Sequence, residues 1–427
     1  MILSKIKKTL QISDKHIYWA RTVTEFGGYQ FLSQILIALG GIVVVRGLSK
    51  EQYAYYTIAF AMFSTLNILS NSGISSALLA LGGKVWRSRD HFSRLINTGL
   101  RLRKLFASVV IIIIIPILNY LLIKQGADVA FAIAITGIIL VGLYFQLSSG
   151  IFVIIPKLHG LTKKLQYIEL VYAGSRLFLL LAASLLFFNA ITAIIAVCCA
   201  FLIQMFFLLK IREGYVDAKA PVNTEYQKRI LKTVKHILPT SVFYCLQGQI
   251  IIWLIAIFGN TEKIADIGAL ARLAIIFSVV MKTVTHIVQP RFARLPENRF
   301  LIRKYFQILC AFGFFSIFLL SIAVTFPEEL LWVLGSQYMH LKGALFLIVL
   351  STILHKLSGI LVLLNMARGW VKKLWINIPA TIIFQLILVL VLDLSSITGV
   401  ILFSIFSVIP SLLINVLLSY RGFSKLS

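Results

Sequence analysis

The sequence predicts an all-α integral membrane protein with about twelve transmembrane helices, and three observations lead to this fold class. First, the 427 residues are 59% apolar and 13% charged, with a mean hydropathy of +0.94. Soluble domains average about 45–50% apolar and about 25% charged residues. Second, twelve apolar windows are each long enough for a helix that crosses the bilayer, which needs about 20 residues. Third, basic residues concentrate in every second connection between these windows.

The same composition excludes several classes of protein. A chain with this apolar content is neither a soluble enzyme nor a secreted disulfide scaffold. Its apolar segments also lack the alternation of apolar and polar residues with period two that is typical of an outer-membrane barrel. The net charge of +26 and pI of 10.1 would suggest nucleic-acid binding in a soluble protein. Here basic cytosolic loops explain the charge, so we expect no nucleic-acid partner. The four cysteines lie inside apolar runs without zinc-ligand spacing, and we expect neither a metal nor a cofactor.

The expected spans follow one another along the whole chain. Residues 1–24 are basic and lack the apolar core of a signal peptide, so they are predicted to lie on the membrane surface as a cytosolic lead-in. The apolar windows fall, within a few residues at each end, at 25–45, 54–82, 105–123, 129–155, 167–188, 190–209, 237–258, 267–288, 305–325, 341–365, 375–393 and 398–419.

The distribution of Lys and Arg predicts the topology. The two termini and the even-numbered connections hold 32 of the 41 basic residues, and four others lie within spans. The odd-numbered connections hold five, which are Arg46, Lys50, Lys124, Lys263 and Lys342. Because cytosolic loops carry the excess of Lys and Arg, both termini are predicted to be cytosolic.

The chain divides into two halves of six spans each. A six-helix lobe at 25–209 and another at 237–419 flank a basic segment, 210–236, which is predicted to be a cytosolic linker. Residues 420–427 form a cytosolic tail. The pair Glu51 and Ala54 recurs 211 positions later as Glu262 and Ala265. Such an arrangement fits two parallel halves related by an axis along the membrane normal.

Four basic residues lie within the predicted spans, where a charge costs about 2.5–3.5 kcal/mol on insertion scales. Arg176 lies about 14 Å deep, at about 1.5 Å per residue, and Lys356 is similarly central. We therefore expect both to line a cationic cavity that binds an anionic substrate. Arg272 and Lys282 lie nearer the surfaces, so they either line the same cavity, snorkel to the membrane surface, or pair with another residue.

Acidic and uncharged polar residues complete the candidate site. Glu169 precedes Arg176 by two helical turns, so an Arg176–Glu169 pair is the structural alternative. Ser64, Asn67, Asn71 and Ser75 form a polar stripe on the second span. The polar residues expected to line the cavity are Gln30, Gln34, Asn67, Asn71, Gln247 and His286. Hydrogen bonds between helices, worth about 0.6 kcal/mol each, are the alternative role for any one of them.

No motif points to catalysis. The chain has no Walker A sequence, no HExxH and no pair of carboxylates within one span, so we expect a protein that is not an enzyme. A domain that would bind ATP is also missing from the sequence. Transport by this chain must then draw on a gradient or on the membrane potential.

Four sequence segments resemble a known group of exporters. They are Arg46-Gly-Leu-Ser-Lys-Glu-Gln-Tyr-Ala-Tyr-Tyr-Thr, Asn71-Ser-Gly-Ile-Ser-Ser-Ala-Leu, Ile267-Gly-Ala-Leu-Ala-Arg-Leu and Gln289-Pro-Arg-Phe-Ala-Arg-Leu. The first is similar to the R-G-L-S-x-x-x-Y-x-x-Y turn of polysaccharide exporters. With the length and the twelve spans, the chain resembles Wzx-type O-antigen flippases of the MOP (MATE-like) superfamily.

The resemblance implies two six-helix lobes in a V around a central cavity, in a bacterial inner (cytoplasmic) membrane. It implies an undecaprenyl-pyrophosphate-linked oligosaccharide as substrate, moved from the inner to the outer leaflet by alternating access. A polysaccharide polymerase and a chain-length regulator would be its partners. A cationic cavity suits this cargo, because a Lys or Arg about 4 Å from the pyrophosphate returns about 4 kcal/mol at an effective dielectric of 20.

Two other functions stay open at this stage. A MATE-like multidrug or cation antiporter commonly carries an acid within the first helix, whereas here Glu25 lies at its cytosolic edge. A scramblase-like or structural membrane protein would not need four intramembrane cations. The coupling ion is also open, with Glu169 and His286 as candidate titrating groups.

Overall fold

A computed structural model describes residues 28–293, 295–370 and 374–424, and every regular element in these ranges is a helix. The first half contains the helix Gly28–Gly47, here called the first helix, then α2 (Lys50–Asn71), α3 (Ile74–Val85), α4 (Arg89–Lys124), α5 (Val129–Phe152), α6 (Ile154–Leu158), α7 (Thr162–Leu186) and α8 (Ala190–Tyr215). The second half contains α9 (Thr224–Phe258), α10 (Thr261–Leu273), α11 (Ile275–Thr283), the π-helix η1 (Val284–Val288), α12 (Gln289–Ala293), α13 (Arg299–Thr325), α14 (Pro327–Leu334), the 3-10 helix η2 (Ser336–Leu341), α15 (Lys342–Ala367), the 3-10 helix η3 (Leu374–Ile376), α16 (Asn377–Val391), α17 (Ile397–Ser407) and α18 (Ile409–Phe423).

The predicted all-helical membrane architecture is confirmed. Within the described ranges, ten helical stretches are long and apolar enough to cross a bilayer. Each of the two remaining windows, 54–82 and 267–288, is divided between consecutive helices, which are α2 and α3 in the first and α10, α11 and η1 in the second. The predicted lead-in, 1–24, and the last residues of the tail lie outside the described residues.

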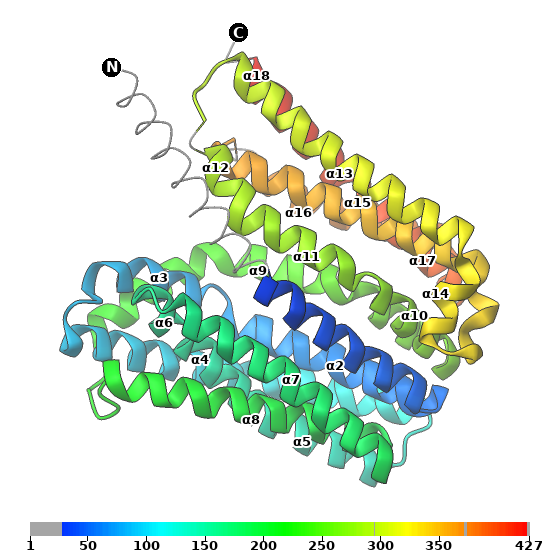
Figure 1. The fold of residues 1–427 in the computed structure, drawn as a ribbon, viewed down its shortest axis with the longest axis horizontal. Helices are drawn as coiled ribbons and strands as arrows, with labels where there is room; N and C mark the ends of the chain where they lie inside the picture. The colour runs from blue at the N-terminus through cyan, green and yellow to red at the C-terminus, as the bar shows by residue number, and fades with distance from the viewer. Residues whose placement is uncertain (1–27, 294, 371–373, 425–427) are drawn as a thin grey trace, which may run out of the picture.

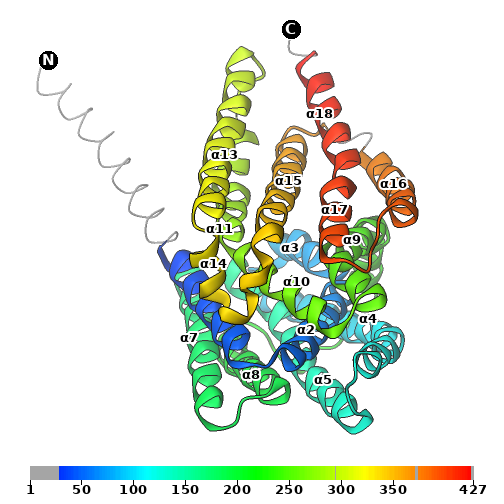
Figure 2. The ribbon, with the colours of Figure 1, turned by 90° about the vertical axis from the view of Figure 1, so that its right-hand side faces the viewer.

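The helices form two groups that meet at one end and diverge toward the other (Figure 1). The first group is the first helix with α2–α8, and the second is α10–α18. The helices α2 and α10 lie side by side where the groups meet (Figure 2). We call this end, which carries the connections 48–49 and 259–260, the outer end, after the topology predicted from the sequence. The opposite end is called the inner end.

The packing of buried side chains explains this shape. Near the outer end, one hydrophobic core contains residues of both groups, from Tyr53 and Tyr56 of α2 to Leu270 of α10. Near the inner end there are two separate cores. One joins α3, α4 and α8 to the inner part of α9 through Ile230, and the other lies within the second group around Phe292. The two halves are therefore held together chiefly at the outer end.

The linker is shorter than the sequence indicates. The predicted linker 210–236 is helical from residue 224 onward, because α9 begins at Thr224 with Asn223 as its cap. Tyr226, Ile230 and Val234 of this segment are buried against the first group. Basic residues on the exposed face of this amphipathic segment made it look like a solvated loop. The connection itself covers only 216–223.

Helix positions agree with an internal repeat. The first helix ends at Gly47 and α9 ends at Phe258, 211 positions later. Likewise α2 begins at Lys50 and α10 begins at Thr261. The recurring Glu and Ala thus occupy the first turns of equivalent helices, where a carboxylate interacts favourably with the helix dipole.

The polar stripe predicted on the second span does not lie on one continuous helix. The helix α2 ends at Asn71, and the backbone then turns through Ser72 and Gly73, with φ of 35° and 89°. A Cβ at Gly73 would lie 2.9 Å from the Ile237 side chain of α9, so both the turn and the close packing require glycine. The expectation of a four-residue stripe was wrong because this left-handed turn breaks the helical period.

The topology can be tested by labelling single cysteines in a chain whose native cysteines are replaced by serine. Lys219→Cys, in the predicted cytosolic connection, should resist a membrane-impermeant thiol reagent added outside the cell. Lys263→Cys, on the opposite side, should react with it. Reaction at residue 219 without reaction at residue 263 would reverse the assignment of the outer and inner ends.

Candidate functional site

The second half contains a partly open cavity of about 460 Å³, whose lining is mainly apolar but includes several polar side chains. The described residues that line it belong to α9, α11, η1 and α15–α18, with Val408 at the junction of α17 and α18. Its polar lining residues are Tyr244, Gln247, Thr285, His355, Lys356, Ser358, Asn377, Thr381, Ser407 and Ser411. The volume lies within the range of about 300–1,000 Å³ that is typical of small-molecule sites.

Lys356 is the one charged side chain among the lining residues that the structure describes. It lies in the middle of α15 and is half-buried. No hydrogen bond or ion pair joins its ammonium to another described residue. A charge inside a membrane protein is usually paired or functional. The cavity thus presents an uncompensated positive charge that an anion could neutralise.

The neutral polar groups around Lys356 are largely occupied by one another. The side-chain amides of Gln247 and Gln385 exchange two hydrogen bonds, of 2.9 and 2.7 Å, and so join α9 to α16. The hydroxyls of Ser358 and Ser411 lie 2.8 Å apart. These mutual bonds join the helices that form the cavity wall, whereas the Lys356 ammonium bonds to no described residue.

A second polar site crosses from one half of the protein to the other. The Gln30 amide on the first helix donates to the Glu169 carboxylate of α7 and accepts from the Lys282 ammonium of α11, at 3.2 Å. One turn further, Gln34 accepts from the hydroxyl of Ser278, at 3.1 Å. The first helix therefore bridges the two groups, and Glu169 and Lys282 are linked through one amide.

Arg176 lies in the first half and apart from the Lys356 cavity. Its side chain is only 9% exposed, and its Nε atom has no hydrogen-bond partner in the described structure. Tyr172, one turn earlier on α7, lies within hydrogen-bonding reach of the guanidinium. Among the described side chains, no ion pair joins Arg176 to Glu169. The Glu169 carboxylate instead accepts a hydrogen bond from the Gln30 amide. The Arg176–Glu169 pair, which was the structural alternative to substrate binding, is therefore not formed among the described residues in this conformation.

Arg272 has partners within the protein. Its Nε atom donates to the Tyr53 hydroxyl, at 3.2 Å, and its guanidinium lies over the ring of Tyr56, 5.8 Å from the centroid. Both tyrosines are on α2, so Arg272 ties α10 to α2 near the outer end. This arrangement matches the pairing alternative for Arg272, and Lys282 likewise pairs with Gln30.

The two asparagines of the predicted stripe have internal partners. Asn71 accepts from the backbone and hydroxyl of Ser75, across the turn between α2 and α3. Asn67 accepts from Arg103 of α4, at 2.8 Å. The sequence placed Arg103 in a cytosolic connection, yet only 4% of its surface is exposed. The connection is shorter than predicted because α4 begins at Arg89. The side chain of His286, in η1, lies outside the described residues.

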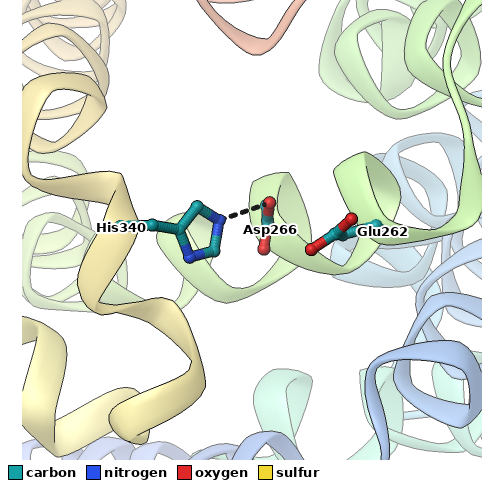
Figure 3. Close-up of side chains that lie close together, drawn as sticks. All are labelled: Glu262, Asp266 and His340. Carbon is teal, nitrogen blue, oxygen red and sulfur yellow. Dashed lines mark hydrogen bonds and ion pairs between the residues drawn. The ribbon is translucent and has the colours of Figure 1, made fainter.

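The outer end carries a cluster of charged residues that links the two halves. The Lys50 ammonium of α2 lies 2.5 Å from Glu262 Oε1 and 3.7 Å from Asp266 Oδ1, both on α10. His340 Nε2, from η2, lies 2.9 Å from Asp266 Oδ2 (Figure 3). The hydrogen bond and charge of Lys50 hold the pKa of Glu262 below its usual range. We call these four residues the Lys50 cluster.

Further contacts across the halves surround this cluster. Arg46 donates to the Trp332 carbonyl, at 2.6 Å, and lies over its ring, 4.5 Å from the centroid. Lys124 donates to the carbonyl of Ile257, at 2.5 Å, and Gln125 to that of Ala256, at 2.9 Å. With the shared core beneath them, these bonds close the outer end, while the inner ends of the helices lie apart (Figure 1).

The comparisons with known proteins agree with this geometry. No protein-family model matches the chain, and no curated protein sequence matches it significantly. An inward-facing MATE multidrug transporter of the MOP superfamily superposes with a TM-score of 0.72 at 14% identity, over 92% of this chain and 94% of that one. The lipid II flippase MurJ, in an inward closed conformation, superposes with a TM-score of 0.71 at 14% identity, over 94% of this chain and 89% of that one.

An outward-facing MATE transporter is less similar, with a TM-score of 0.59 at 15% identity over 93% of each chain. The higher scores for inward conformations fit a molecule that is closed at its outer end. The matching proteins are transporters and a flippase rather than enzymes. The chain therefore has the all-helical membrane fold shared by MATE transporters of the MOP superfamily and the lipid II flippase MurJ.

Proposed function

We propose that this protein is a flippase that moves an undecaprenyl-pyrophosphate-linked oligosaccharide from the inner to the outer leaflet of a bacterial cytoplasmic membrane. The observation that carries the proposal is the Lys356 ammonium, which has no partner among the described residues and lines a cavity of about 460 Å³. A pyrophosphate is costly to bring into the membrane without a cation nearby. The fold it shares with the lipid II flippase MurJ supports a lipid-linked substrate.

The substrate enters, in this proposal, from the inner end, where the two halves lie apart. Its pyrophosphate binds Lys356, and Arg176 stabilises the charge from the first half once the halves rearrange. Opening of the outer end then requires the bonds of the Lys50 cluster and of Arg46 to break. The glycan is released into the outer leaflet, and the empty protein returns to the conformation described above.

A MATE-like multidrug or cation antiporter is the second candidate, because MATE transporters match the fold as well as MurJ does. A cationic drug needs a negative charge in its site. Among the described residues that line the Lys356 cavity there is no carboxylate, and its only charged residue is a lysine. This charge favours an anionic substrate over a cationic one.

Deletion of the gene in its host distinguishes the two candidates. We expect the deletion strain to lose a surface polysaccharide and to accumulate its lipid-linked precursor on the cytoplasmic side. Susceptibility to cationic dyes and drugs should stay unchanged, and a plasmid copy should restore the polysaccharide. Normal surface glycan together with increased drug susceptibility would favour the antiporter instead.

Energy coupling gives a separate prediction. The described residues form only membrane-type helices and no nucleotide-binding domain, so purified protein in vesicles should respond to a membrane potential or an ion gradient and not to ATP. Glu169→Gln removes the carboxylate that accepts a hydrogen bond from Gln30. We expect transport by this variant to respond less strongly to a proton gradient. Full transport driven by ATP alone, without any gradient, would contradict this prediction.

A further inference from the structure

The Lys50 cluster contains the ligand types of a divalent metal site. The Glu262 and Asp266 carboxylates and the His340 imidazole offer ligand atoms that all lie within 4.8 Å of one another. Glu262 and Asp266 are four residues apart on α10, so they share one face of the helix. Figure 3 shows His340 pointing toward Asp266 from the neighbouring segment. Carboxylate oxygen with imidazole nitrogen is a ligand set that Zn²⁺ accepts.

Asp266 supplies an independent sign that a cation belongs here. Its side chain is almost fully buried, and its Oδ1 atom has no hydrogen-bond partner among the described residues. This oxygen faces the Lys50 ammonium, 3.7 Å away. The helix dipole explains why a carboxylate, Glu262, lies in the first turn of α10. It does not explain why a second carboxylate, Asp266, is buried beside His340.

The ammonium of Lys50 lies against both carboxylates and supplies the positive charge that a metal ion would otherwise bring. It comes from α2 in the first half, whereas the three ligands belong to α10 and η2 in the second. The two carboxylates and the ammonium give the cluster two negative charges and one positive charge. When the halves separate at the outer end, Lys50 leaves with α2, and the two carboxylates lose their cation. A divalent ion would then neutralise both of them.

We propose that Glu262, Asp266 and His340 form a divalent-cation site. While the outer end is closed, Lys50 masks this site. When the halves separate, the site becomes accessible to an external cation. Such an ion competes with Lys50 and holds the protein open toward the outside. The inference relies on alternating access but not on the lipid-linked substrate. Failure of the metal test and failure of the flippase proposal are therefore distinguishable.

Zn²⁺ binding to the purified full-length protein, without a polyhistidine tag, tests the site by competition with a fluorescent zinc chelator. Lys50→Met keeps the apolar stem of the side chain and removes its charge. We expect this variant to bind Zn²⁺ at least about tenfold more tightly than the wild type, a change of about 1.4 kcal/mol. Adding His340→Ala to Lys50→Met should abolish the gain, and His340 is exposed enough to replace without disturbing the core.

Lys124→Met is the matched control, because Lys124 also bridges the two halves at the outer end but, among the described residues, bonds to a carbonyl and not to a carboxylate. Its Zn²⁺ affinity should remain that of the wild type. An equal gain in both lysine variants would mean that loosening the outer end is sufficient, which contradicts masking by Lys50. Equal Zn²⁺ binding by Lys50→Met with and without His340→Ala would overturn the metal site itself.

Discussion

Lys356→Met should abolish export of the surface polysaccharide while the protein still accumulates in the membrane. Methionine preserves the length of the side chain in α15 and removes only its charge. An ammonium about 4 Å from a phosphate contributes about 4 kcal/mol at an effective dielectric of about 20, and water in the cavity lowers this value. Even a quarter of this free energy would change the dissociation constant of the substrate by about fivefold. Complementation of a deletion strain, scored by surface glycan and by immunoblot, measures the effect.

Two variants make the Lys356 result specific. Lys356→Arg keeps a positive charge and should retain part of the activity, since both side chains bind phosphate, with different geometry. Lys84→Ala removes an exposed lysine that lines none of the described cavities, and it should export normally. Wild-type glycan from well-expressed Lys356→Met would remove Lys356 from the substrate site.

Arg176→Ala is expected to have the second-largest effect, again a loss of surface glycan at normal protein levels. The guanidinium is buried with an unsatisfied Nε atom, so it has bonding capacity to offer a phosphate. Arg176→Lys should retain partial function, whereas Arg176→Glu should retain none. The same complementation assay applies to all three variants.

A purely structural role for Arg176 makes a different prediction. If Arg176 and Glu169 pair during transport, Glu169→Gln should be as harmful as Arg176→Ala, and the double variant should recover. In the conformation described here Glu169 bonds to Gln30 instead. We therefore expect no recovery in the double variant. Recovery would assign Arg176 to folding or gating rather than to substrate binding.

The fold was predictable because a bilayer imposes strong and simple rules. Long apolar runs and alternating basic connections lead directly to a multi-pass helical membrane protein. The interruptions within those passes were not predictable to the same degree. The break after Asn71 depends on two left-handed residues packed against Ile237 of α9, a contact between distant parts of the chain. The buried face of residues 224–236 likewise becomes visible only when α9 lies on the first half.

The candidate site was only partly predictable, because a sequence shows which residues are polar but not which ones meet. Arg272 and Lys356 look alike as charges within spans, yet Arg272 bonds to Tyr53, 219 positions away, and Lys356 has no described partner. The sequence also indicated Gln247 but not Gln385, its partner from a helix 138 residues later. His340 lies 74 residues from Asp266, and no local pattern joins them.

Flipping of a lipid-linked pyrophosphate oligosaccharide by the purified protein in proteoliposomes tests the central proposal most directly. The lipid is placed in the inner leaflet, and its arrival in the outer leaflet is measured with an enzyme that modifies only exposed glycan. We predict transfer by the wild type under a membrane potential or ion gradient, and none by Lys356→Met. Transfer at equal rates by the two proteins, or uptake of a cationic dye in place of the lipid, would contradict the proposal.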